Sequence, residues 1–278
     1  MKRFRSTHLQ VKSAVVAILL AGSLGAFRST AVAAPEATLL GFSSADFQIV
    51  DPASHAVIGT ARYAVMRQGS GISLRGDDRY ASGQYDFERD RFDTPIGGLP
   101  VLTSADHYFF LANGAPEFQS NYDLKSGLAS CTDFRSHPPV TRTAQIFPPP
   151  DTWAGASVMI PIQEFLRRGG TGTLDTHVFN CAPGPKIFAV KVTITQTQSE
   201  SPLFRPGAVE VDVKPDFGWL NLIAAPFIPH LHAWFDPSHD WEFVGATLAR
   251  FYKGPDIMLG RIFAPAAPVG ALEAEPLR

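Results

Sequence analysis

Apolar and polar residues alternate along most of the chain after residue 36, and turn residues interrupt this alternation at short intervals. The alternating runs cover 37–50, 55–68, 72–93, 106–124, 176–198, 207–223 and 229–263, and they are rich in β-branched and aromatic residues. A period of two residues places successive side chains on opposite faces of a strand. Asn113-Gly114 is a strong hairpin signal between two such runs. Strands joined by short turns predict an antiparallel meander, because parallel neighbours need long crossover connections.

Residues 151–170 break this pattern and are predicted to be helical. Asp151 can cap a helix, and Gly169-Gly170 can end it after Arg167 and Arg168. Pro161 lies within the stretch, so we expect either two short helices or one helix from about Ile162 to Arg168. The preceding residues 135–150 are rich in proline and are interpreted as a surface loop of extended conformation, with an inter-domain linker as the alternative.

The first 33 residues have the features of a cleavable signal peptide. Four basic residues precede an apolar stretch from Ala14 to Phe27, and Ala31-Val32-Ala33 fits a cleavage site. An uncleaved signal anchor is the alternative reading. No later segment is long and apolar enough to span a bilayer as a helix. We therefore expect export to the periplasm or secretion, with one β-rich domain over 34–265 and a flexible tail over 266–278.

The charge balance after the predicted signal argues against nucleic acid as a partner. The whole chain has 24 Lys+Arg and 26 Asp+Glu, and residues 1–33 hold five of the basic residues and none of the acidic ones. The remainder therefore has a formal net charge of about −7, whereas nucleic-acid binding needs clustered Lys and Arg.

Two cysteines, Cys131 and Cys181, lie in the part predicted to be exported. A disulfide between them can persist in an oxidising compartment. Two separate buried thiols are the alternative, because free cysteine is among the most buried residue types. No C-x-x-C motif is present, so a thioredoxin-like redox site is not supported.

Candidate catalytic groups are few. The chain has no G-x-S-x-G, H-E-x-x-H, P-loop or G-x-G-x-x-G motif. Asp86, Glu88 and Asp90 share one face of a predicted strand and could serve glycoside hydrolysis if they were held at the right separation. The alternative is a solvated strand face whose charges pair across neighbouring strands. The sequence thus predicts no catalytic residue and no cofactor.

The stretch PHLHAWFDPSHDWEF, residues 229–243, holds the candidate ligand-binding residues His230, His232 and Trp234. On a strand these three side chains point to one side, and Asp236-Pro237 suits the first two positions of a type I turn before a return strand. His230, His232 and His239 could bind a metal ion if the side chain of His239 approached the other two. If this side of the strand faces solvent, the histidines are ordinary surface residues.

Aromatic residues are abundant: 21 Phe, 6 Tyr and 4 Trp. An antiparallel sheet of this length usually curls into a barrel or packs as a sandwich. A curled sheet closed by a helix can enclose an apolar ligand cavity, although the same residues can simply fill a solid core. The fold class predicted is mainly β: an antiparallel curled sheet or half-open barrel with one or two short helices.

Several stretches resemble an uncharacterised group of secreted, β-rich bacterial proteins known as a domain of unknown function. They are GTARYAVMRQGSG, YASGQYDFERD, YDLKSGLASC, DTWAGASVMIPIQEFLRRG, HVFNCAPGPK and AWFDPSHDWEFVGATLARFYKGPDIML. The expected arrangement of strands around a short helix is also similar, in architecture alone, to the periplasmic lipoprotein carriers with a half-open β-barrel. Neither resemblance implies catalytic or ligand residues.

These features favour a protein without catalytic activity that binds an apolar or amphipathic, lipid-like ligand or serves envelope maintenance. Two other functions stay open. One is a secreted hydrolase or lyase that uses the strand carboxylates or the histidines. The other is a protein-binding envelope module that offers an edge strand to its partner.

Overall fold

The structure is a computed structural model that describes residues 43–94, 99–182, 184–198, 203–216 and 231–263. All of them belong to one compact unit, Ala37–Arg278, and the other unit, Met1–Glu36, lies outside the described residues. The predicted signal peptide (1–33), the predicted tail (266–278) and His230 also lie outside them. The described helices include none that is both long and apolar enough to cross a membrane.

Fifteen strands of the described residues make up one sheet. They are β1 (Ser44–Val50), β2 (Val57–Gln68), β3 (Gly71–Tyr80), β4 (Tyr85–Asp93), β5 (Val101–Phe110), β6 (Pro116–Asp123), β7 (Leu128–Asp133), β8 (Val140–Gln145), β9 (Thr152–Ala154), β10 (Thr173–Cys181), β11 (Pro185–Gln198), β12 (Val209–Pro215), β13 (Leu231–Asp236), β14 (Glu242–Ala249) and β15 (Asp256–Arg261). The helical elements are η2 (Gly155–Val158), α1 (Met159–Arg167) and η5 (Pro237–His239).

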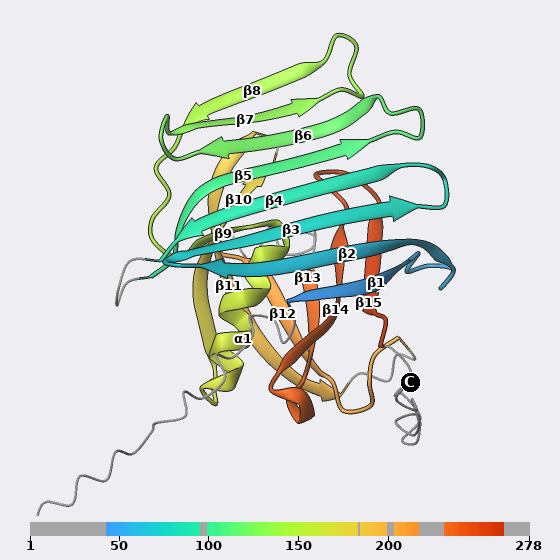
Figure 1. Cartoon of the computed structure of the whole chain (residues 1–278), viewed down its shortest axis with the longest axis vertical. Helices are drawn as coiled ribbons and strands as arrows, with labels where there is room; N and C mark the ends of the chain where they lie inside the picture. Colours follow the sequence, from blue (N-terminus) through green and yellow to red (C-terminus); the bar gives the residue numbers. More distant parts are fainter. Residues whose placement is uncertain (1–42, 95–98, 183, 199–202, 217–230, 264–278) are drawn as a thin grey trace, which may run out of the picture. The chain divides into compact units, whose positions relative to one another are not determined.

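The order of strands confirms the predicted meander. It runs β8-β7-β6-β5-β4-β3-β2-β1-β15-β14-β13-β12-β11-β10-β9, so that almost every strand pairs with its neighbour in the sequence (Figure 1). All pairs are antiparallel except the pair of β9 and β10. The first and last strands of the meander, β1 and β15, pair in the middle of the sheet. The strands at the two ends, β8 and β9, do not pair with each other, so the sheet is open, and the predicted mainly β fold with a short helix is confirmed.

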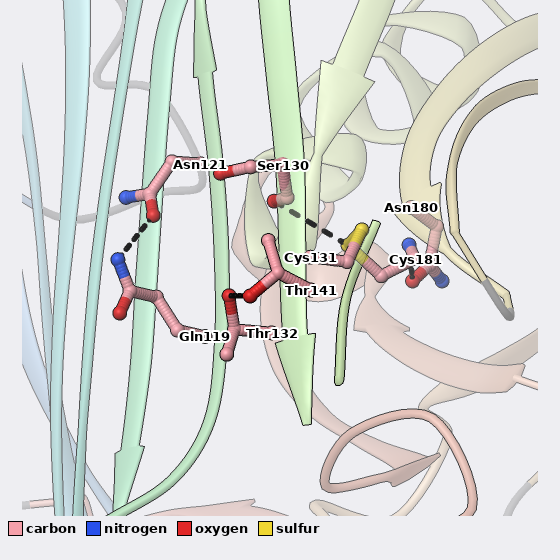
Figure 2. Close-up of a disulfide and its surroundings, with 8 residues drawn as sticks. All are labelled: Gln119, Asn121, Ser130, Cys131, Thr132, Thr141, Asn180 and Cys181. Atoms are coloured by element: carbon pink, nitrogen blue, oxygen red, sulfur yellow. Dashed lines mark hydrogen bonds between the residues drawn. A yellow bond between two sulfur atoms is a disulfide. The ribbon is translucent and has the colours of Figure 1, made fainter. Parts of the chain in front are cut away.

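A disulfide connects the two ends of this open sheet. It joins Cys131 of β7 to Cys181 of β10, with a Cα–Cα distance of 5.9 Å (Figure 2). Both cysteines are buried and belong to a small cluster with Phe118 and Phe251. The bridge closes a stretch of 50 residues that contains β8, β9, η2 and α1, and so holds this stretch next to the rest of the sheet.

The helical region differs from its prediction in two ways. Asp151 does not cap a helix; its carboxylate contacts His177, and the chain passes through β9 before η2 begins at Gly155. α1 begins at Met159, two residues before Pro161. A proline is tolerated there because the N–H groups of the first helical turn have no partner within the helix. The predicted end is correct, since Gly169 adopts a positive φ and its N–H bonds to the carbonyl of Leu166.

Residues predicted to form only a loop contain β8, the edge strand that pairs with β7. Their side chains are almost all exposed, so they show none of the alternation that identifies a half-buried strand.

The aromatic residues on the inner side of the sheet fill a core together with α1. Phe92 contacts Trp153, with ring centroids 4.8 Å apart, and Phe47 contacts Phe243 at 5.7 Å. The inward face of α1 contributes Met159, Ile160, Ile162 and Leu166 to the same cluster. The inner aromatic side chains therefore pack largely on one another and on the helix.

Candidate functional site

The inward face of β4 carries acidic side chains next to this apolar core. Asp86, Glu88 and Asp90 lie on the same side of the strand, as the sequence predicted, and Phe92 continues that side. The interpretation of this side as a solvated face is wrong: Asp90 is 0% exposed, Asp86 is 7% exposed, and 17% of the Glu88 side chain is exposed. Buried carboxyl groups need partners, because the loss of water is costly for a charge.

His107 of β5 lies directly opposite Glu88 in the strand register and completes the group that we call the carboxylate site: Glu88, Asp90 and His107. Nε2 of His107 lies 2.8 Å from Oδ1 of Asp90 and 3.9 Å from Oε1 of Glu88. One possible ligand atom from each residue lies within 4.8 Å of the other two. Among the described residues, this is the group of three acidic, histidine or cysteine side chains close enough to hold one metal ion.

η2 covers the carboxylate site from the other side. The N–H of Ala156 donates a hydrogen bond to Oε1 of Glu88 over 2.7 Å. A Cβ atom on Gly155 would lie 2.2 Å from the same oxygen and 2.9 Å from Cε1 of His107. Only glycine therefore allows the backbone to approach Glu88 this closely.

Burial raises the pKa of both carboxyl groups to about 8. For Glu88, the negative charge of Asp90 raises the pKa further, while His107 lowers it. For Asp90, the neighbouring side chains of Glu88 and Ser157 partly offset the effect of burial on the pKa. Because both pKa values lie near 8, the pair of carboxyl groups holds a proton near neutral pH.

A second polar cluster lies at the neighbouring end of β4. Nε of Arg250 donates to Oδ2 of Asp86 over 2.8 Å, and its Nη1 donates to Oε2 of Glu117 over 2.8 Å. The hydroxyl of Tyr80 donates to Asp86 over 3.0 Å. Asp78 lies opposite Asp86 in the strand register, and burial together with the charges of Asp86 and Glu88 raises its pKa well above the usual value. In this cluster Arg250 therefore compensates the charge of Asp86, and the raised pKa of Asp78 favours the protonated, neutral form of that side chain.

The outward face of the same strands carries a row of aromatic rings. The rings of Tyr85 and Phe110 stack with centroids 4.3 Å apart, those of Phe110 and Tyr108 lie 6.3 Å apart, and those of Tyr108 and Phe87 lie 6.4 Å apart. We call these four residues the outer aromatic row. Tyr85 is 41% exposed, and the other three are partly exposed.

Arginine side chains border the outer aromatic row. The guanidinium groups of Arg75 and Arg89 lie over the ring of Phe87, at 5.4 and 5.1 Å from its centroid. These two arginines also line an open cavity of about 390 Å³, together with Arg91, Asp93 and Thr103 among others, but none of the four rings of the outer aromatic row lines it. Arg75 pairs with Asp77, whereas no carboxylate of the described residues forms an ion pair with Arg89 or Arg91. This outer surface thus combines exposed rings with available positive charge.

The structure keeps His232 and Trp234 side by side, with ring centroids 6.2 Å apart, and gives His232 and His239 different carboxylate partners. Nδ1 of His232 contacts Oε1 of Glu210 at 2.8 Å, and Nδ1 of His239 contacts Oδ2 of Asp236 at 2.8 Å. Trp234 is 8% exposed, and its ring stacks on Phe204 at 4.4 Å. The predicted hairpin is present, with Asp236 accepting a hydrogen bond from the N–H of Ser238. Because His230 lies outside the described residues, ligand or metal binding by this histidine group stays a prediction.

The sequence did not predict a role for two residues of these inner clusters, His107 and Arg250. His107 was one of several isolated histidines, and Arg250 was one of many arginines within a strand-rich run. Only the strand register brings His107 opposite Glu88, and only the curvature of the whole sheet brings Arg250 to Asp86. No local pattern in the sequence marks either pairing.

Comparison with known proteins finds one structural likeness. No family model and no curated protein matches the chain. Among solved structures, the chain is similar to a beta-barrel-like protein of the domain of unknown function DUF1849 from Brucella abortus. The two chains are 9% identical, the match covers 79% of this chain and 94% of that chain, and the TM-score is 0.45. That neighbour is, like the group that the sequence resembles, a β-rich domain of unknown function.

Proposed function

We propose that this protein is a non-enzymatic binding protein of the cell envelope that holds an anionic amphipathic ligand on the outward face of β3, β4 and β5. The observation that carries this proposal is the outer aromatic row beside Arg89 and Arg91, two arginines without a carboxylate partner among the described residues. The sequence predicted an apolar or amphipathic ligand in an apolar cavity; the proposed ligand is in addition anionic, and its site lies on the outer side of the sheet.

The outer aromatic row suits the apolar part of such a ligand. Its rings stand next to one another along the sheet and are only partly covered. Aromatic side chains offer large contact areas at low cost in conformational entropy, so they are common in binding surfaces. The inner aromatic side chains are less suited, because they already pack on one another and on α1.

The arginines suit the anionic part. A guanidinium group donates paired hydrogen bonds to a phosphate or carboxylate, and these bonds are stronger than those between neutral groups. The cavity of about 390 Å³ beside Arg89 and Arg91 lies within the usual size range of ligand sites. The chain is acidic after residue 33, so this positive surface contrasts with the charge of the chain around it.

Vesicle binding tests the proposal. Purified protein is sedimented with vesicles of phosphatidylcholine alone or of phosphatidylcholine mixed with phosphatidylglycerol, which adds a phosphate charge. We expect binding to the anionic vesicles, and we expect Arg89→Ala with Arg91→Ala to weaken it by about tenfold or more through loss of charge-assisted hydrogen bonds. Phe87→Ala should weaken it through loss of ring contacts.

Two matched variants control for charge and apolar area. Arg168→Ala removes one positive charge from a side chain that is 81% exposed at the end of α1. Phe147→Ala removes a ring that is 72% exposed, outside the outer aromatic row. Both should bind like the unaltered protein. If the double arginine variant binds as well as the unaltered protein, or if neither kind of vesicle binds, the proposal is wrong.

A further inference from the structure

We propose that Glu88, Asp90 and His107 bind a divalent transition-metal ion on the inner side of the sheet. This site is separate from the outer surface of the proposed function, since β4 presents Glu88 and Asp90 to its inward face and Phe87 and Arg89 to its outward face. Each of the two proposals can therefore be tested, and can fail, without consequence for the other.

The spacing of the three side chains matches the needs of a small ion. Bonds of about 2.1 Å at a tetrahedral angle place two ligand atoms about 3.4 Å apart. The distances from Nε2 of His107 to the carboxylate oxygens of Asp90 and Glu88, 2.8 and 3.9 Å, lie on either side of that value. Adjustments of about half an ångström, within reach of side-chain rotation, would equalise them.

A second, independent observation is that Asp90 is fully buried and that one of its carboxylate oxygens has no hydrogen-bond partner. Its side chain is 0% exposed, and its Oδ2 atom has no hydrogen-bond donor within reach. The nearby hydroxyl of Ser157 donates its proton to the carbonyl of Ala154 instead. A fully buried carboxylate oxygen without a partner is costly, so Asp90 requires either a proton shared with Glu88 or a cation.

The groups around the carboxylate site are arranged as support for metal ligands. The N–H of Ala156 donates to Oε1 of Glu88 over 2.7 Å and so fixes the position of this carboxylate beside His107. Hydrogen bonds of this kind orient ligating carboxylates in metal sites. Because Gly155 and Ala156 belong to η2, an ion here would connect β4, β5 and the segment that leads into α1.

The ligand chemistry indicates which ions to test. Two carboxylates and one imidazole suit Zn²⁺ or Mn²⁺, whereas Mg²⁺ and Ca²⁺ prefer sites built of oxygen atoms alone. Zn²⁺ is the appropriate probe, because it accepts four ligands from carboxylate and imidazole groups and has no redox chemistry of its own. A water molecule can supply the fourth ligand.

Metal content and titration test the proposal on the full-length protein. After treatment with a chelator and its removal, the protein is titrated with Zn²⁺ by calorimetry, and the bound metal is counted by mass spectrometry. We expect one Zn²⁺ per chain, a rise in the midpoint of thermal unfolding with Zn²⁺, and little effect of Mg²⁺. Glu88→Gln, Asp90→Asn and His107→Gln should each weaken Zn²⁺ binding by about a hundredfold or more, as loss of a direct ligand does.

Two further measurements keep the outcomes separate. Circular dichroism checks that the three variants are folded. We expect this of Glu88→Gln and Asp90→Asn because the amides resemble the protonated carboxyl groups in size and shape. A variant with His232→Gln and His239→Gln tests the other histidine group and should keep the bound Zn²⁺. Absence of stoichiometric Zn²⁺ in the unaltered protein overturns the proposal and leaves the shared proton as the partner of Asp90. Loss of Zn²⁺ in the histidine pair variant alone also overturns it.

Discussion

Arg250, the residue that follows β14, forms an ion pair with Asp86 of β4, although 164 residues separate them in the chain. Both side chains are buried, at 3% and 7% exposure. The same guanidinium group reaches Glu117 of β6 and lies over the ring of Tyr80 at 4.8 Å. One side chain thus links β14 to β3, β4 and β6 across the inner side of the sheet, without any strand pairing between β14 and these three.

Arg250→Met should lower the free energy of unfolding by about 3–5 kcal/mol, because it leaves the buried Asp86 without its cation. Unfolding in urea, followed by circular dichroism, measures the change. The double variant Arg250→Met with Asp86→Asn should recover part of the lost free energy of unfolding, since it removes the uncompensated negative charge of Asp86. Arg62→Met, at a well-exposed ion pair with Asp46, should change the free energy of unfolding far less. Equal effects of the two arginine variants would contradict this account.

The stability of the metal-free protein should fall as the pH rises from about 4.5 to 8. Burial raises the pKa values of Glu88 and Asp90 to about 8, so the folded state holds protons in this range that the unfolded state has released. Because the folded state then binds more protons, the free energy of unfolding falls by up to about 1.4 kcal/mol per pH unit for each extra proton. Urea unfolding at a series of pH values measures this slope.

Glu88→Gln should flatten that slope, because the amide cannot be ionised. Asp46→Asn is the matched control. Its pKa is lowered by Arg62, so its contribution is lost only as the pH falls through the acidic range below about 4. The control should therefore leave the slope above pH 4.5 unchanged. A Glu88→Gln variant with the slope of the unaltered protein would show that the pair holds no proton near neutral pH.

The strands were predictable because alternation is a local property. β2, β3 and β4 alternate clearly, and the turns between them carry glycine residues at the expected places, so the meander followed from sequence alone. β8 was missed because it lies at the edge of the sheet and has almost no buried side chain to create an alternation. Of the two alternatives for the helical stretch, the single helix from about Ile162 starts too late, because it treats Pro161 as a boundary, whereas Pro161 occupies the first turn of α1.

The inward direction of β4 was not predictable from its own residues. One side of this strand offers Tyr85 and Phe87, and the other offers Asp86, Glu88 and Asp90. Hydrophobicity alone would bury the aromatic side. The acidic side is the inner one, and it is supported by His107 and Arg250, which lie 17 and 164 residues away from Asp90 and Asp86. A candidate site of this kind depends on distant pairings that a single sequence does not display.

Replacement of both cysteines by alanine should destabilise the protein by about 4 kcal/mol. The disulfide between Cys131 and Cys181 spans 50 residues, and closing a loop of that length restricts the unfolded chain by about this amount in the chain-entropy model. Urea unfolding of the double variant, compared with the unaltered protein in the presence and absence of a reductant, tests the value. The reduced protein and the double variant should behave alike. A loss confined to the double variant would indicate damage to packing instead of loss of the bridge.

Gly155→Ala should destabilise the protein more than Gly169→Ala does, although both glycines adopt a positive φ. At Gly169 a Cβ atom would meet nothing within 4 Å, so that variant shows the backbone penalty alone, about 1–2 kcal/mol. At Gly155 the new atom would lie 2.2 Å from Oε1 of Glu88, so the backbone or the carboxylate must move and the hydrogen bond from Ala156 weakens. Glu88→Ala removes the carboxylate oxygen that would obstruct this Cβ atom. In a Glu88→Ala background, the loss of free energy of unfolding caused by Gly155→Ala should therefore fall toward that caused by Gly169→Ala. Urea unfolding of the four variants completes this cycle, and an unchanged cost would show that η2 and the Glu88 carboxylate are not coupled.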